Sequence, residues 1–218
     1  MPSAPSPFLA HELFEAEQKN ILAIRTISDF DIVTDDFDED RIINYHIAPI
    51  TKNWLKERFI WCDGTLDIQQ TYENRLVDMC YRIDPQMLTT LNKIIFIRYE
   101  ADIPKVCEKI HADEDEWPSV IDFDDNKALG CHWWAHSCII INVSSIDKTL
   151  AEMKQESEND GLYFNEATEE WIGIATTLLH EIRHLGLSNP FLDITAYPTS
   201  AESEQEVEAW AIKQFEAL

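Results

Sequence analysis

The amino-acid sequence predicts a single α+β domain over residues 1–218. Segments with helical periodicity are interspersed with short runs rich in Ile, Thr and Phe, which are typical of strands. No internal repeat, low-complexity tract or linker divides the chain. Because 45% of its residues are hydrophobic, a chain of this length can bury a substantial core.

The predicted elements mix helices and strands along the whole chain. We expect helices at 9–19, 66–81, 147–158 and 165–185, with a last helix from about 200. We expect strands at 21–33 and 93–99, and a strand or hairpin at 130–143 whose final part is buried. Acidic loops are predicted at 35–40 and 111–125. Asn165 has a side chain suited to cap a helix, and Gly186 is placed to end it.

The chain is strongly acidic, with 41 Asp or Glu against 17 Lys or Arg and a formal net charge of -24. Nucleic-acid affinity comes largely from Lys and Arg that displace counterions, so a nucleic-acid partner is not expected. A basic protein partner or substrate is compatible with this charge.

The apolar runs and the cysteines bear on where the chain resides. The longest apolar runs, 94–97 and 138–141, are far shorter than the roughly 20 residues of a membrane-spanning helix. Residues 1–17 have neither the basic start nor the apolar stretch of a secretory signal. The five cysteines are scattered and odd in number, which argues against a disulfide framework. We therefore expect a cytoplasmic protein without a membrane segment.

An H-E-x-x-H pattern stands in the predicted helix 165–185, where His180 and Glu181 precede His184. Residues four apart on an α-helix lie about 40° apart on one face, so both imidazoles can bind one metal ion. Glu181 projects about 100° from His180 and can lie beside the metal without binding it. The pattern predicts His180 and His184 as metal ligands and Glu181 as a general base acting on metal-activated water.

The same helix has two different faces. Its apolar stripe consists of Trp171, Ile174, Ala175, Leu178, Ile182 and Leu185. Its second face holds small and polar residues, namely Gly173, Thr176, Thr177, His180 and His184. A histidine pair on such a face suits a cleft.

A catalytic zinc ion takes three protein ligands and leaves one position for water, so a third ligand is required. The last predicted helix carries glutamates at positions 202, 204, 206 and 208. Its inward face is defined by Val207, Ala211, Ile212, Phe215 and Leu218. Glu204 and Glu208 fall within that face, whereas Glu202 and Glu206 point away, and the helical geometry leaves Glu204 and Glu208 as alternatives.

The motif and the downstream glutamate together resemble the gluzincin branch of zincin-type zinc metallopeptidases. The residues at 204–211, Glu-Gln-Glu-Val-Glu-Ala-Trp-Ala, are similar to the Glu-x-x-Ala-(Asp/Asn)-x-(Phe/Tyr)-Ala signature of M48-type membrane-associated endopeptidases and ImmA/IrrE-type regulator-cleaving peptidases. The resemblance implies Glu204 as the third ligand of one zinc ion. Val207 and Glu208 depart from the Ala and the Asp or Asn of the signature, which keeps Glu208 as an alternative ligand.

The resemblance also implies a zincin-like core at 129–218, with 1–128 left unassigned. In such a core an edge strand precedes the active-site helix and pairs with extended substrate, which implies substrate contacts by Trp133, His136 or nearby backbone. His132 or His136 is a candidate for stabilising the oxyanion, with Tyr163 and Tyr197 as further donors.

Two other metal-binding arrangements are less well supported. Cys131 to Cys138 has soft ligands at both ends, but structural zinc sites usually use Cys pairs separated by two to four residues. Asp193 is an alternative third ligand whose neighbours do not match the motif of an aspartate-type site.

These observations predict a zinc-dependent metalloprotease, a hydrolase that cleaves peptide bonds in a protein or peptide substrate. The alternative hypothesis is an acidic binding protein or nucleic-acid mimic that engages a basic partner and has a non-catalytic metal site. The oligomeric state is not predicted.

Overall fold

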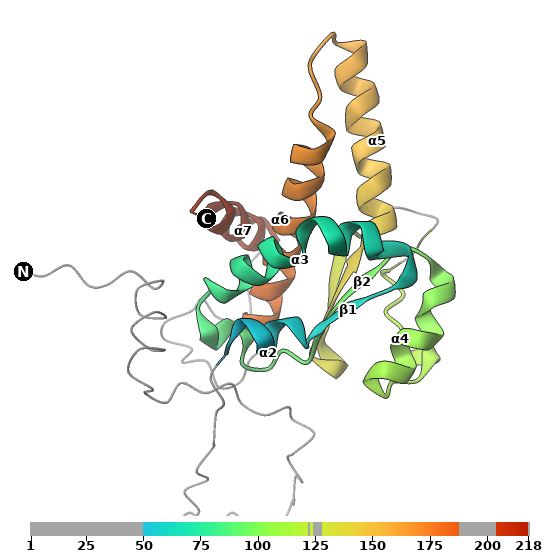
Figure 1. The fold of residues 1–218 in the computed structure, drawn as a ribbon, viewed down its shortest axis with the longest axis vertical. Coiled ribbons are helices and arrows are strands. Elements are labelled where there is room, and N and C mark those ends of the chain that lie inside the picture. The colour runs from blue at the N-terminus through green and yellow to red at the C-terminus, as the bar shows by residue number, and fades with distance from the viewer. Residues whose placement is uncertain (1–49, 122, 124–127, 188–203, 218) are drawn as a thin grey trace, which may run out of the picture.

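Four short strands form one mixed sheet in the described chain (Figure 1). The computed structural model describes residues 50–121, 123, 128–187 and 204–217. The strands are β1 (Phe59–Trp61), β2 (Lys93–Ile97), β3 (Gly130–Trp133) and β4 (Cys138–Asn142), in the spatial order β1-β2-β4-β3. Strands β1, β2 and β4 are parallel, whereas β3 pairs antiparallel with β4 and forms an edge. The predicted α+β class is therefore confirmed.

Six helices accompany the sheet in the described residues. They are α2 (Lys52–Lys56), α3 (Leu66–Tyr81), α4 (Ile103–Ile110), α5 (Val143–Asn159), α6 (Glu166–Leu187) and α7 (Glu204–Glu216). Short 3-10 turns lie at Asp63–Thr65, Pro85–Leu88, Glu100–Asp102, Glu114–Glu116 and Trp134–His136. None of these helices is long and apolar enough to cross a membrane.

Several predicted boundaries agree with the structure and two do not. Helix α3 has the predicted bounds, and Asn165 caps α6 by accepting a hydrogen bond from the Thr168 backbone N–H at 3.3 Å. Helix α5 begins earlier than predicted, because the Asn142 side chain caps it by accepting from Ser145 N at 3.2 Å. Gly186 does not end α6, which continues to Leu187. Gly186 instead permits close packing, since a Cβ there would lie 2.4 Å from Met87 Cε.

The predicted elements at 9–19, 21–33 and 35–40 lie outside the described residues. The single domain over 1–218 stays a prediction, as does its division at 129. Within the described chain, the sheet combines strands from both sides of that position.

The two faces of the sheet are covered by different helices. Alternate residues of a strand point to opposite faces. Ile94 and Phe96 of β2 pack into a core with α3 and α6, whereas Ile95 and Ile97 pack with α4 on the other face. Every residue of the predicted apolar stripe of α6 belongs to the first core or packs against it. This stripe holds α6 on the sheet and leaves its second face turned away from the core.

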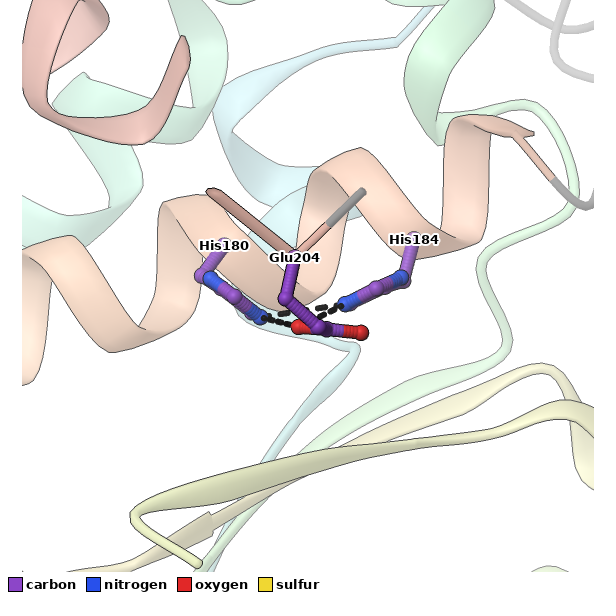
Figure 2. A group of neighbouring side chains, drawn as sticks. All are labelled: His180, His184 and Glu204. Atoms are coloured by element: carbon purple, nitrogen blue, oxygen red, sulfur yellow. Dashed lines mark hydrogen bonds and ion pairs between the residues drawn. The ribbon is translucent and has the colours of Figure 1, made fainter. Parts of the chain in front are cut away.

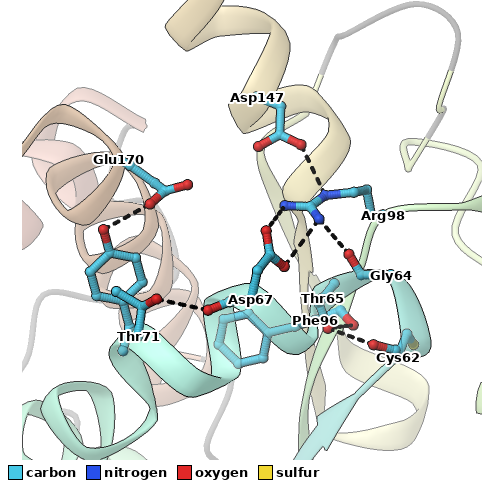
Figure 3. Close-up of polar contacts among 10 residues, drawn as sticks. Cys62, Gly64, Thr65, Asp67, Thr71, Phe96, Arg98, Asp147 and Glu170 are labelled. Carbon is cyan, nitrogen blue, oxygen red and sulfur yellow. Dashed lines mark hydrogen bonds and ion pairs between the residues drawn. The ribbon is translucent and has the colours of Figure 1, made fainter. Parts of the chain in front are cut away.

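Arg98, which directly follows β2, joins three segments at the carboxyl end of the parallel strands (Figure 3). Its guanidinium donates to both carboxylate oxygens of Asp67 at 3.0 and 3.1 Å and to the backbone carbonyl of Gly64. It also forms an ion pair with Asp147 at 2.9 Å. Asp67 is in the first turn of α3 and Asp147 is in α5, so one side chain connects these two helices to the sheet.

We predict that Arg98→Met lowers the free energy of unfolding by about 2 kcal/mol, because several charge-assisted hydrogen bonds of a largely buried side chain are lost. Urea denaturation measures the change. Lys105→Met is the matched control, since Lys105 pairs with Asp63 at 2.9 Å on an exposed surface and should matter far less. Equal losses in the two variants would contradict the connecting role of Arg98.

Candidate metal centre

Helix α6 presents His180 and His184 to a cleft of about 920 Å³ between α6, α7 and β3. Both residues lie on the helix face opposite the buried stripe and are half-buried. Glu204 and Glu208 reach the same cleft from α7, as the inward face predicted for that helix requires. Glu206 is not among the residues that line the cleft, and Glu202 lies outside the described residues.

The ligand atoms of His180, His184 and Glu204 converge on one point (Figure 2). The Nε2 atoms of the two histidines are 3.0 Å apart. One carboxylate oxygen of Glu204 lies 3.2 Å from Nε2 of His180 and 3.4 Å from Nε2 of His184. The three atoms thus form a nearly equilateral triangle. Within the described residues, no other group of three His, Cys, Asp or Glu side chains meets in this way.

This triangle has the size that a metal ion would impose. A tetrahedral zinc ion with bonds of about 2.0–2.1 Å holds its ligand atoms about 3.3–3.4 Å apart. Two imidazole nitrogens and one carboxylate oxygen suit zinc, and the same donors also bind iron(II). His180, His184 and Glu204 are therefore a candidate metal-binding group, and they leave room for a further ligand on the cleft side.

Glu181 is next to the candidate ligands but is not one of them. Its side chain lines the cleft, although the residue is only 6% exposed. Burial raises the pKa of its carboxyl to about 8, and the charge of Glu204 adds to this increase. The backbone N–H of His132 donates a hydrogen bond to the carboxyl, which lowers its pKa and offsets part of the increase. The role of Glu181 as a general base stays a prediction.

Strand β3 brings one of the predicted oxyanion candidates to the cleft. His132 lines it, and burial together with the nearby His184 lowers the pKa of His132 to about 4. A neutral imidazole therefore faces the candidate ligands at neutral pH. Its backbone N–H is already used to hold Glu181.

The predicted substrate contacts Trp133 and His136 do not lie at the cleft. Trp133 is 4% exposed and packs in the core on the opposite face of the sheet, because alternate residues of β3 point to opposite sides. His136 pairs with Glu116 at 3.2 Å and stacks edge-on against Trp133. Trp134, which directly follows Trp133, is strongly exposed and does line the cleft.

The remaining predicted candidates do not meet at the metal group. Tyr163 is 89% exposed in the turn between α5 and α6 and does not line the cleft. Cys131 and Cys138 belong to no metal-ligand group among the described residues. Tyr197 and Asp193 lie outside the described residues.

Two residues near the candidate centre were not predicted from the sequence. Arg183 occupies a variable position of the motif but is 3% exposed, with its guanidinium 5.5 Å from the ring centre of Trp210 on α7. It thereby contributes to the α6–α7 contact behind the ligands. Gly130 lies in β3 directly against α6. A glycine within a predicted strand indicates that another part of the backbone can approach closely, so the sequence contained evidence for this contact.

Comparisons with protein-family models, with curated protein sequences and with solved structures find no match to this chain.

We predict that Gly130→Ala destabilises the protein by about 2 kcal/mol and weakens metal binding, because overpacking forces strand and helix apart. The added Cβ would lie 2.7 Å from Thr177 Cγ2 and 3.0 Å from Glu181 Cγ. Gly173→Ala is the matched control, since its Cβ would meet only Ile146 Cγ2 at 3.5 Å and alanine favours the helix. Unfolding and metal titrations test both variants, and equal stability of the two would contradict the close approach.

Proposed function

We propose that the protein is a zinc-dependent metallopeptidase in which His180, His184 and Glu204 hold the metal. The observation that carries this proposal is the convergence of three ligand atoms at 3.0–3.4 Å, with a buried carboxylate at the next residue of the motif. A structural zinc site would be closed by a fourth protein ligand. Only three such side chains meet here within the described residues, which supports a catalytic centre.

A bound zinc ion would activate a water molecule and polarise the carbonyl of the scissile bond. Glu181 is the general base that accepts the proton of the water and delivers it to the leaving amine. The His132 backbone N–H orients the Glu181 carboxyl, and the buried wall around it keeps bulk solvent away from this proton.

The cleft supports a peptide as the substrate. Its volume of about 920 Å³ is at the upper end for small-molecule sites. It is lined by residues of β3, an edge strand of the described sheet that can pair with an extended chain. Its walls are largely apolar, with Val120, Leu129, Trp134, Ile172 and Ile212. The exposed carboxylates in its lining within the described chain are Glu204 and Glu208, which favours neutral or basic segments over acidic ones.

We predict that His184→Ala and Glu204→Ala each weaken zinc binding at least about 100-fold, since even the loss of an outer-shell partner commonly costs 10–100-fold. Glu208→Ala removes the same charge one helical turn away and should retain zinc. Elemental analysis and competition with a chelating dye measure stoichiometry and affinity. Full retention of zinc by His184→Ala would reject the metal centre, and loss of zinc in Glu208→Ala alone would make Glu208 the third ligand.

We predict that Glu181→Gln keeps the metal but lowers peptide hydrolysis by about 10²–10⁴-fold, the usual contribution of a general base. The measurement is turnover of an unbiased fluorogenic peptide library with and without chelator. Glu216→Gln, an exposed charge at the end of α7, is the matched control. Unchanged turnover in Glu181→Gln, or turnover that survives the chelator, would reject the proposed mechanism.

A further inference from the structure

A second hollow lies between α3, α6 and α7 and shares no lining residue with the metal-centre cleft. It has a volume of about 330 Å³ and is lined by Arg75, Asp78, Met79, Arg82, Trp171 and Phe215. We call it the arginine groove. Two arginines at one hollow stand out in a chain of net charge -24.

The guanidinium of Arg75 is positioned by stacking and not by an acidic partner. It lies 3.8 Å from the ring centre of Trp171. Arg58 makes a similar stack on Trp54 at 3.4 Å, but it also donates to the backbone carbonyls of Leu91 and Trp54 at 3.1 and 3.3 Å. No described residue accepts a hydrogen bond or forms an ion pair with Arg75. The donors of Arg75 are thus held in place at the groove and available to a ligand.

The other lining residues complete a site for an amphipathic anion. Arg82 caps the carboxyl end of α3 seven residues after Arg75, and both arginines line the groove. Asp78, between them, is paired with Lys52 at 2.7 Å, and the lining of the groove holds two positively charged side chains against this one carboxylate. Met79 is buried, and the rings of Trp171 and Phe215 lie 6.3 Å apart, which provides an apolar wall beside the two cations.

We propose that the arginine groove binds a small organic anion, with its carboxylate or phosphate on Arg75 and Arg82 and its apolar body against Trp171 and Phe215. A guanidinium offers a planar pair of donors that matches both oxyanions. The groove volume lies at the lower end of small-molecule sites, which fits a ligand of about one aromatic ring with an acidic group. This proposal does not depend on peptidase activity.

The test uses the full chain and three probes, phenyl phosphate, benzoate and neutral benzyl alcohol. Saturable shifts of the Arg75 Nε–H and Trp171 indole signals in ¹H–¹⁵N NMR spectra, with either anion, support the proposal, and the tighter anion identifies the acidic group. Arg75→Gln should weaken the anion about tenfold, as expected for loss of a charge-assisted hydrogen bond. Lys213→Gln, which removes an exposed charge on α7 outside the groove, should leave binding unchanged.

Three results would overturn the proposal. They are the absence of saturable shifts with both anions, equal binding of benzyl alcohol, and equal losses in Arg75→Gln and Lys213→Gln. Because a variant that unfolds would lose binding trivially, thermal unfolding of each is compared first. Arg82→Gln provides an independent substitution at the same groove, and it too should weaken the anion.

Discussion

The packing of α6 on the sheet determines where the candidate metal centre lies. The buried stripe of α6 orients the helix, and the missing side chain at Gly130 lets β3 approach it closely. This single contact places the backbone of β3 beside Glu181 and turns both histidines toward the cleft. Without the contact between β3 and α6 the motif would still be helical, but β3 would not form a wall of the cleft and the Glu181 carboxyl would not be buried.

The sequence predicted the parts of the site that follow from helical geometry. The spacing of His180 and His184, the apolar stripe and the inward position of Glu204 all depend on 100° per residue, which the chain alone reveals. The sequence did not predict which face of β3 meets α6. The predicted contacts Trp133 and His136 lie away from the cleft because β3 has only four residues, and so short an alternation does not reveal which side chains face the helix. Gly186 was misjudged because a glycine needed for close packing resembles one that ends a helix.

The charged side chains of the described residues lie in distinct local environments. The carboxylates of the cleft lie at the candidate centre. Asp67 and Asp147 instead pair with Arg98 and connect α3 and α5 to the sheet. The arginine groove differs from both, because its lining has more positive than negative side chains. The net charge of the chain describes none of these three environments, because salt screening limits the effect of each charge to a distance of about 10 Å.

Helix α7 packs on α6, with Val207 and Ala211 as its buried residues and with Trp210 and Phe215 partly buried against the main core. It supplies Glu204, whose side chain is 76% exposed, to a group otherwise built on α6. Because this carboxylate and the two histidines stand on different helices, a bound metal ion would link metal affinity to the docking of α7 on α6. Any change that shifts α7 along α6 would therefore change the affinity for the ion, even where it alters none of the three ligand side chains.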